Sequence, residues 1–368
     1  MKLLKIAILA NDTTYVYNLR REIIERLIAD GNLVYIVGKV LDFHDELEIM
    51  GAQLVDIDIG RHGTNLLSDV KLFFNYIGVL LKKKPDIVLS YNIKPNVYGG
   101  MACKALGIRY MPNITGLGTA VEFPGPMQWL TTRLYKIGVS RAACVFFQNE
   151  ENKQFFINHG MLSNEFRIRL LPGSGVNLKF FPAVPYPEGE TVNFLYVSRL
   201  MKEKGIDIYI AAAKLIWEKY KNVVFHVCGG CDDEKYLSIL KEAEEAGYVI
   251  YHGSQKNMLP FFTMANCIVH PSYYPEGMSN VLLEAASSAR AIITTDRSGC
   301  RETVDDGRSG YIIPIKDERA LVDAIERFIA LSWEEKRNMG LSGRTKMEKE
   351  FDRNIVVKAY AEEIGKLY

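Results

Sequence analysis

The chain has 368 residues, of which 48% are hydrophobic and 24% charged, a composition typical of a soluble globular protein with room for two domain cores. Its net charge of +1 argues against a dedicated nucleic-acid-binding protein. No segment reaches the roughly 20 apolar residues of a membrane-spanning helix, so a cytoplasmic protein is expected.

The chain begins with MKLLKIAILAND, whose basic start and apolar run are superficially those of a signal peptide. Because the run is short, Lys5 interrupts it and no small-residue cleavage site follows, residues 5–9 are predicted to form a first β-strand. Apolar residues then recur at helical spacing from Leu19 to Ile28, and Gly31 stands where a C-cap glycine would end that helix.

Short apolar runs alternate with amphipathic stretches along nearly the whole chain, which predicts parallel sheets covered by helices on both faces. The segment AVPYPEGET (183–191) predicts a linker between two such series. The strands expected before the linker are 5–9, 33–37, 86–90, 144–149 and 168–172, and those expected after it are 193–198, 223–230, 248–253, 267–272, 291–296 and 310–314.

The predicted fold class is α/β, with two Rossmann-like parallel-sheet domains, 1–182 and 183–350, that face a central cleft. The stretch 316–368 is helical by its composition and charge spacing. Its last part, 351–368, is expected to form a helix that crosses back to the N-terminal domain. Ligands of such sheets bind beyond the carboxyl ends of the strands, so the residues that follow the strands are the candidates for function.

Two cations follow the first strand of the second series. In SRLMKEKG, Arg199 stands directly after the strand and Lys204 five residues later. Both suit a diphosphate, the arginine as a planar fork and the lysine as a point charge. A solvated charged turn is the alternative interpretation of the same residues.

Two further features follow the next strands. Gly229 and Gly230 permit a ligand to approach the backbone closely, although a tight turn needs the same residues. The turn YHGSQKN (251–257), which contains Ser254 and Gln255, could hold the edge of a base through its backbone groups. Neither feature is specific by itself.

The fourth feature, YYPEGMSNVLLEA (273–285), places two glutamates around a helix predicted to begin near Ser279. Glu276 would accept hydrogen bonds from sugar hydroxyls, and Glu284, on the same face as Asn280, could reach two vicinal hydroxyls of a ribose. An ordinary helix cap with two surface glutamates is the alternative, but four features after strands of one sheet favour a ligand site. The N–H groups expected to point out of the helix as an anion or hydroxyl site are those of Gly277, Met278, Ser279 and Asn280.

Several of these motifs together resemble the retaining glycosyltransferases of family 4, which have the two-domain GT-B fold. The resemblance covers almost the whole chain. Within the family, the sequence is most similar to bacterial enzymes that build capsular, O-antigen and lipid-linked glycans. The motifs that carry the resemblance are SRLMKEKG, PSYYPEGMSNVLLEA and SGCRETVDDGRSGYIIP, with NITGLGTA, FFQNEENKQFF and LLPGSGVN in the first domain.

The resemblance implies that Arg199 and Lys204 hold the donor diphosphate and that Glu284 binds its ribose. It also implies that Glu276 and the backbone of 277–280 hold the donor sugar, so Arg199, Lys204 and Glu276 are the expected catalytic residues. The expected donor is a UDP-linked hexose or N-acetylhexosamine. Two cations at the leaving phosphate favour an oxocarbenium-like transition state, so neither a metal nor a cofactor is expected.

The sequence departs from the family at two places on the acceptor side. Many members carry a histidine near residues 113–115 that contacts the donor sugar, where NIT stands here and leaves Asn113 or Thr115 as stand-ins. The glycine-rich loop after the first strand is here NDTTY. The resemblance therefore says less about which sugar and which acceptor are used than about the transfer reaction itself. The acceptor-side candidates are Asp12, Thr13, Thr14, Asn113, Thr115 and Gly116.

No metal site is predicted. Asp56-Ile57-Asp58 is a D-x-D of the kind that metal-dependent transferases use, but it lies in an alternating edge-strand pattern and is interpreted as structural. Cys228 and Cys231 have C-x-x-C spacing without a second pair or a histidine cluster. We interpret them, with the four other cysteines, as reduced and mostly buried thiols of a cytosolic protein.

Two other function classes use the same fold. A nucleotide-sugar epimerase, or a glycogen-phosphorylase-like enzyme, would share the donor site. A non-catalytic nucleotide-sugar-binding protein is the binding-module alternative, against which the joint presence of Arg199, Lys204, Glu276 and Glu284 argues.

The acceptor and its location follow from weaker signals. Segments 70–86 and 126–142 mix aromatic and apolar residues with Lys and Arg, as interfacial helices do, although helices packed on a sheet are the alternative. Residues 1–175 carry 20 Lys and Arg against 16 Asp and Glu, so +4, whereas the rest carries 25 against 28, so −3. With the resemblance, this predicts a lipid-linked or polysaccharide acceptor and peripheral association with the inner face of the cytoplasmic membrane.

Overall fold

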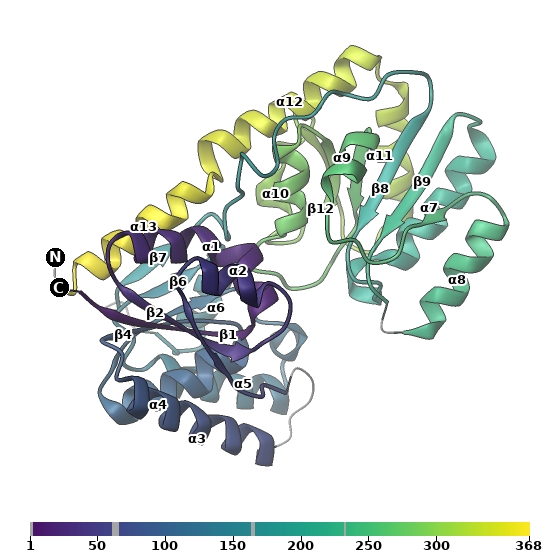
Figure 1. Cartoon of the computed structure of the whole chain (residues 1–368). Helices are drawn as coiled ribbons and strands as arrows, with labels where there is room; N and C mark the ends of the chain where they lie inside the picture. The colour runs from purple at the N-terminus through teal and green to yellow at the C-terminus, as the bar shows by residue number, and fades with distance from the viewer. Residues whose placement is uncertain (1–2, 61–65, 163–165, 232) are drawn as a thin grey trace. The chain divides into compact units, whose positions relative to one another are not determined.

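The computed structural model describes residues 3–60, 66–162, 166–231 and 233–368, so Met1 and Lys2 of the N-terminal motif lie outside the described residues. The chain forms two compact units (Figure 1). Unit 1 consists of Met1–Ser174 together with Arg353–Tyr368, and unit 2 is Gly175–Asp352. The chain therefore leaves unit 1 once and returns to it with its last helix. The boundaries between the two units predicted from the sequence lie after residues 182 and 350, compared with 174 and 352 in the structure.

The sheet of unit 1 is parallel, and seven strands form it within the described residues. β3 lies at its edge, as the alternating pattern around Asp56 predicts. β5 was missed as a strand because Pro112 and Asn113 interrupt its apolar run, and β6 pairs with it only from Asn113 onward. In sheet order the strands are β3 (Gln53–Asp56), β2 (Leu33–Lys39), β1 (Lys5–Asp12), β4 (Ile87–Tyr91), β5 (Arg109–Ile114), β6 (Val145–Phe147) and β7 (Ile168–Leu170).

Helices cover both faces of this sheet (Figure 1). Gly31, at φ +87°, follows the first helix at the predicted place, and its N–H donates to Ile28 O (2.8 Å). One face packs against α1 (Thr13–Ala29), α2 (His44–Ile49) and α13 (Arg353–Gly365). The other packs against α3 (Leu66–Lys83), η1 (Pro95–Gly99), α4 (Gly100–Leu106), η2 (Thr119–Val121), α5 (Pro126–Val139) and α6 (Glu150–Asn158).

The sheet of unit 2 is also parallel, and all six strands predicted for it are present, although β10 is shorter than expected. In sheet order they are β10 (Ile250–Tyr251), β9 (Val223–Cys228), β8 (Val192–Val197), β11 (Cys267–His270), β12 (Ala291–Thr295) and β13 (Gly310–Ile313). The helices and helical turns of this unit are η3 (Lys202–Lys204), α7 (Ile206–Lys219), α8 (Glu234–Glu245), α9 (Leu259–Met264), α10 (Asn280–Ser287), η4 (Arg301–Thr303), α11 (Glu318–Ala330) and α12 (Trp333–Glu350).

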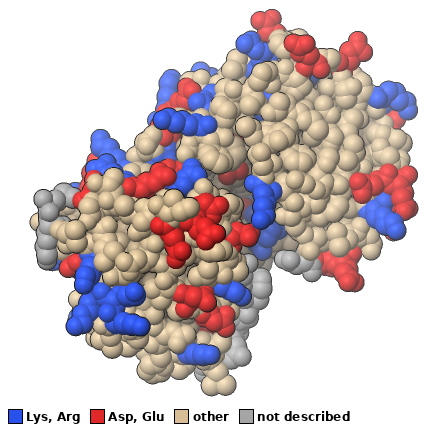
Figure 2. Space-filling view, in the orientation of Figure 1, with Lys and Arg blue, Asp and Glu red and all other residues tan. Residues whose placement is uncertain are grey.

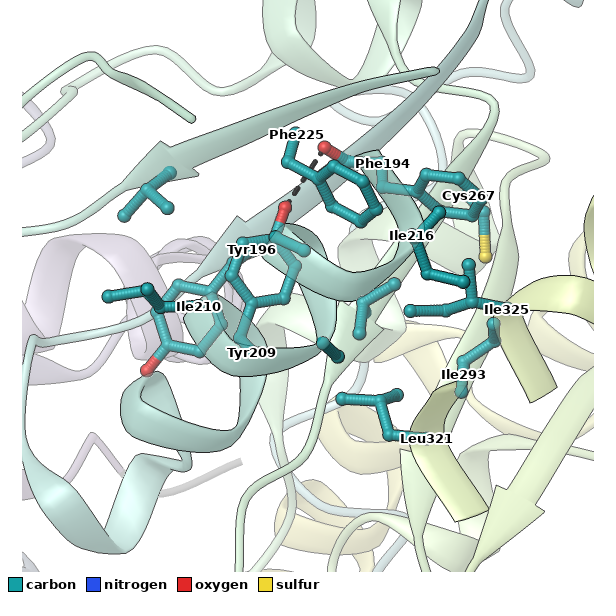
Figure 3. Packing of buried hydrophobic residues seen from close by; sticks show 14 of the residues in the cluster. Phe194, Tyr196, Tyr209, Ile210, Ile216, Phe225, Cys267, Ile293, Leu321 and Ile325 are labelled. Atoms are coloured by element: carbon teal, nitrogen blue, oxygen red, sulfur yellow. Dashed lines mark hydrogen bonds between the residues drawn. The ribbon is translucent and has the colours of Figure 1, made fainter. Parts of the chain in front are cut away.

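The core on the α7 and α11 side of this sheet is rich in aromatic residues (Figure 3). The rings of Phe194 and Phe225, on neighbouring strands, stack with their centroids 5.1 Å apart. The buried hydroxyl of Tyr209 donates to Phe194 O (3.1 Å) and lies 2.9 Å from His226 O. These contacts connect α7 to β8 and β9, and they give the buried Tyr209 hydroxyl the hydrogen-bond partners without which its burial would be costly.

The C-terminal helix α13 belongs to the core of unit 1. Its first residue, Arg353, pairs with Glu22 of α1 (2.9 Å), and Val356 is fully buried beside α1 and the sheet. Tyr360 accepts a hydrogen bond from Asn113 Nδ2 (2.9 Å) at the end of β5. The last residues of the chain thus complete a core that begins with the first strand.

We expect Tyr360→Ala to lower the free energy of unfolding by about 3–5 kcal/mol, because it opens a cavity in this core. Tyr360 is 1% exposed and its ring lies 4.3 Å from that of Phe146. Urea unfolding measures the change. Ile355→Ala, on the same helix but 40% exposed, is the control and should change stability by no more than about 0.5 kcal/mol. Similar losses in both variants would show that α13 does not anchor the core through Tyr360.

Candidate functional site

The loops that follow the strands of unit 2 meet at one edge of its sheet, because the carboxyl ends of parallel strands all lie there. The N–H of Leu200, after β8, donates to Gly230 O after β9 (2.9 Å). The N–H of Gly229 in turn donates to Gly253 O after β10 (2.8 Å). The loops that contain Arg199, the Gly229-Gly230 pair and the turn 251–257 are therefore adjacent, as the sequence predicts.

Two glycines allow these loops to come so close. A side chain at Gly229 would overlap the carbonyl oxygen of Ser198, and one at Gly205, whose φ is +77°, would overlap that of Pro271. Gly230 is different, since a Cβ there would meet only Ser254, at 4.0 Å. Gly229 therefore serves packing between loops, and the open side of Gly230 is where a ligand could lie.

An ion pair joins the loop after β8 to the loop after β11. Lys204, only 8% exposed, donates from Nζ to Oε1 of Glu276. The same Nζ lies 4.8 Å from the ring centroid of Tyr274. The residues expected to hold the diphosphate and the sugar therefore contact each other.

The other predicted donor-binding side chains in these loops lie at the surface. Arg199 is exposed, and none of the described residues forms a hydrogen bond or ion pair with its guanidinium. Ser254 and Gln255 are exposed as well, and Gln255 Nε2 donates to His252 O (2.5 Å). Arg199 can therefore reach a phosphate without first leaving a protein partner.

The start of α10 differs in one respect from the prediction. The helix begins at Asn280 with Ser279 as its N-cap, as expected, but the N–H of Ser279 donates to Gly299 O (2.7 Å). The prediction of a free N–H at Ser279 was therefore wrong, because the loop after β12 covers it. The side chain of Met278 packs in the core, so only its backbone can face a ligand. Glu284, one turn into the helix, is partly exposed.

His270, at the end of β11, was missed by the sequence analysis. It is 1% exposed, and its Nε2 lies 3.5 Å from Ser279 Oγ. Burial, followed by the nearby charge of Lys204, lowers the pKa of His270 to about 3, so the ring is neutral at pH 7. His270 therefore supports the helix start as an uncharged hydrogen-bonding group. In the sequence, the one indication of this role is that His270 is the last residue of the strand and directly precedes Pro271 and Ser272.

Three of the acceptor-side candidates in unit 1 have structural roles. Asp12 Oδ1 accepts from the N–H of Tyr15 (2.8 Å) and caps α1, and the buried Thr13 hydroxyl donates to Asp42 O (2.9 Å). Asn113 is fully buried, with its amide donating to Tyr360, so the prediction that it can stand in for a ligand-contacting histidine needs correction. The candidates that remain partly exposed are Thr14, Thr115 and Gly116.

A buried arginine lies beside these loops and was also missed. Arg20 is fully buried, donates from Nη2 to the Tyr15 hydroxyl (2.9 Å) and lies 4.3 Å from the centroid of the Tyr91 ring. Burial raises the pKa of Tyr15, while Arg20 and a hydrogen bond with Thr115 oppose the rise. The loops after β1 and β5 therefore meet at Tyr15 and Thr115.

Within the described ranges, no group of three or more His, Cys, Asp or Glu residues could hold a metal ion. Asp56 ends the edge strand β3, and its Oδ1 accepts from the N–H of Val40 (3.0 Å). Cys228 is buried, and the partly exposed Cys231 donates from Sγ to Asp233 O (2.9 Å). The D-x-D and C-x-x-C motifs thus have local structural roles.

Comparison with known proteins gives matches over both halves of the chain. Residues 5–149 match the family model Glycosyl transferase 4-like, and residues 181–346 match Glycosyl transferases group 1. Over 97% of both chains, the sequence is 26% identical to the N,N'-diacetylbacillosaminyl-diphospho-undecaprenol alpha-1,3-N-acetylgalactosaminyltransferase of Campylobacter jejuni. It is also 26% identical to the capsular polysaccharide biosynthesis glycosyltransferase CapM of Staphylococcus aureus, over 89% of this chain and 90% of that protein.

The fold is similar to that of HepE from Anabaena, whose crystal structure contains UDP and glucose. The TM-score is 0.79 at 16% sequence identity, covering 99% of this chain and 100% of that chain. At this level of identity the likeness shows a shared fold.

We expect Gly229→Ala to lower the free energy of unfolding by about 1–3 kcal/mol, because the added methyl group collides with backbone atoms that cannot rotate away. Those atoms are the carbonyl group of Ser198. The matched control is Gly230→Ala, one residue later, which meets open space and should change stability by at most about 0.5 kcal/mol. Urea unfolding of both variants measures the difference. Equal stabilities would show that the loops do not depend on the close approach at Gly229.

Proposed function

The chain belongs to the family 4 glycosyltransferases and has their GT-B fold, and from this premise we propose that it transfers a sugar from a nucleotide donor in bacterial surface-glycan synthesis. The proposed donor is a UDP-linked hexose or N-acetylhexosamine, and the proposed acceptor is a lipid-linked glycan or a polysaccharide. The single observation that carries the proposal is the contact of Lys204 with Glu276, which joins the loop that also carries Arg199 to the loop that leads into α10. The relatives' names support it, since two describe surface or lipid-linked glycans and one structure holds UDP.

The proposed donor position follows from the charges of the site. Arg199 and Lys204 take the diphosphate, because a guanidinium and an ammonium there supply two charge-assisted contacts. Glu284, partly exposed on α10, accepts from the ribose hydroxyls. Glu276 and the backbone of Gly277 accept from and donate to the sugar. The glycine at 230 leaves room for the nucleoside.

Donor binding exchanges the partners of the ion pair. Before binding, Lys204 and Glu276 neutralise each other. When the diphosphate arrives, Lys204 turns to a phosphate oxygen, and Glu276 becomes available to sugar hydroxyls. The buried Lys204 thus has a partner in both states, which avoids the several kcal/mol that an unpaired buried ion would cost.

The chemistry proposed for this site is a metal-independent transfer with retention of the anomeric configuration. The bond between the anomeric carbon and the phosphate oxygen breaks, and a bond to an acceptor hydroxyl oxygen forms, through an oxocarbenium-like state. The diphosphate leaves with the bonding electron pair, and the proton of the acceptor hydroxyl passes to the leaving phosphate oxygen. Negative charge grows on the leaving diphosphate during this step. Two fixed cations stabilise that charge more than they stabilise the ground state, which lowers the barrier.

A transfer assay with EDTA present tests the function. The purified chain is incubated with UDP-sugars, with and without a lipid-linked saccharide acceptor, and UDP binding is followed by calorimetry. We expect UDP to bind in EDTA and sugar to be transferred only when the acceptor is present. A free epimer formed without acceptor would make the chain an epimerase, and UDP binding without turnover would make it a sensor. Strict dependence on Mg²⁺ or Mn²⁺ would contradict metal independence.

Lys204→Ala should raise the reaction barrier by about 2–4 kcal/mol, because it removes a charge-assisted contact to the leaving phosphate. Turnover would then fall by about 30- to 1000-fold. The matched control is Lys202→Ala, an exposed lysine of the same loop, which should keep nearly normal turnover. Thermal unfolding of both variants separates loss of chemistry from loss of fold. If Lys204→Ala turns over as fast as Lys202→Ala, Lys204 does not act on the phosphate.

A further inference from the structure

Large apolar side chains are exposed on the outer side of the α3, α4 and α5 layer of unit 1, which we call the α3–α5 face. Phe74 on α3 is 63% exposed, Phe123 before α5 is 71% exposed and Trp129 on α5 is 61% exposed. α4 contacts both α3 and α5, so the three helices form one layer over one face of the sheet. The other exposed apolar side chains of this face are Val70, Leu81, Met127, Leu130 and Ile137.

These side chains are additional to the core. The inner side of α3 packs Leu72 and Tyr76 on the sheet, and the inner side of α5 packs Tyr135 and Val139. Both helices are therefore apolar on two sides, whereas a helix that only covers a sheet is polar on its outer side. The outer apolar side chains stay largely exposed within unit 1, so a second contact surface accounts for them.

The net positive charge of the first half of the chain comes from the stretch that contains this layer. Residues 66–149 contain 10 Lys and Arg against 3 Asp and Glu, so +7, whereas residues 1–65 contain 7 against 10, so −3. None of the three acids in 66–149, a stretch that the structure describes throughout, is exposed: Asp69 is buried and pairs with Lys94 (2.9 Å), and Asp86 and Glu122 are partly buried. Figure 2 shows Lys and Arg side chains gathered at the lower left of unit 1.

Exposed cations stand among the exposed apolar groups of this face. The guanidinium of Arg133 lies 5.5 Å from the ring centroid of Trp129 on the next turn of α5. Pairs of an aromatic ring and a cation suit the boundary between water and lipid, where the ring lies at headgroup depth and the cation meets anionic headgroups. The exposed Lys and Arg side chains of the face include Lys71, Lys82, Lys84, Lys104, Arg133 and Lys136.

We infer that the α3–α5 face binds the surface of an anionic phospholipid bilayer, an inference that rests on the proposed lipid-linked acceptor. Apolar side chains enter the headgroup region while the lysines and arginines attract the negative surface, as in peripheral membrane proteins. In the described part of the chain, no helix combines the length and apolar character needed to cross a bilayer. The contact is therefore interfacial and reversible, and it places unit 1 at the surface that holds its acceptor.

The charge of the face argues against the simplest protein partner, a second copy of the same surface. A symmetric dimer through this face would bring the exposed lysines and arginines of one +7 stretch against those of the other. Like charges opposed at an interface disfavour association. An anionic bilayer satisfies both the apolar and the basic character of the face.

Co-sedimentation of the full chain with vesicles tests the inference. We expect binding to vesicles of phosphatidylglycerol and phosphatidylethanolamine to exceed binding to neutral phosphatidylcholine vesicles by at least tenfold, and to fall when salt is raised. Phe74→Glu and Trp129→Glu should each reduce binding to anionic vesicles at least tenfold. The matched control is Leu215→Glu on α7 of unit 2, which adds the same charge at a leucine that is 47% exposed. This variant should bind anionic vesicles as well as the unchanged chain does.

Activity separates this inference from the proposed function. With a lipid-linked acceptor in anionic vesicles, Phe74→Glu and Trp129→Glu should transfer at least tenfold more slowly than the unchanged chain. With a water-soluble acceptor, they should match it. Equal vesicle binding by all variants, or no binding by the unchanged chain, would overturn the bilayer contact while leaving transfer intact. A dimer in solution that Phe74→Glu dissociates would assign the face to self-association and overturn it too. Absence of transfer to either acceptor would instead overturn the proposed function.

Discussion

The candidate site depends on two places where the backbone has no room for a side chain. At Gly205 the loop after β8 lies against Pro271, and at Gly229 the loop after β9 lies against Ser198. A Cβ at Gly205 would push apart the loops that carry Lys204 and Glu276, and their ion pair would open. A Cβ at Gly229 would push the loop after β9 away from the loop after β8. Parallel strands bring the loops to one edge of the sheet, and the glycines let them contact one another there.

The sequence predicts those parts of the structure that depend on local pattern. Continuous apolar runs mark both sheets, and a Ser-Asn pair before Val-Leu-Leu marks the start of α10. Features that depend on tertiary contacts were not predictable in the same way. Pro112 hides β5, because a proline is unusual within a sheet. The burial of Asn113 depends on Tyr360, which lies 247 residues away along the chain. The capture of the Ser279 N–H depends on a loop from the next strand.

Two opposite charges of the site, Lys204 and Glu276, compensate each other. Burial, together with the charge of Lys204, keeps His270 neutral. A neutral histidine beneath a cation avoids repulsion and still donates or accepts one hydrogen bond at Ser279. In the proposed function, the diphosphate meets Arg199, with whose guanidinium none of the described residues pairs, and Lys204, which it gains by exchange with Glu276. The donor would then bind without first leaving the buried Lys204 unpaired.

The segregation of charge in unit 1 follows from the handedness of its crossovers. In a parallel sheet, the helix that connects two strands crosses over in a right-handed sense. Helices therefore lie on one side of the sheet as long as each new strand is added at the same edge, and on the other side once strands are added at the opposite edge. The order of strands reverses between β3 and β4. Helices α1 and α2, from an acidic part of the sequence, therefore lie on one side with α13, and α3, α4 and α5, from the basic part, lie on the other. A charge difference along the chain thus becomes a difference between two faces, and the basic face also exposes large apolar side chains of α3 and α5.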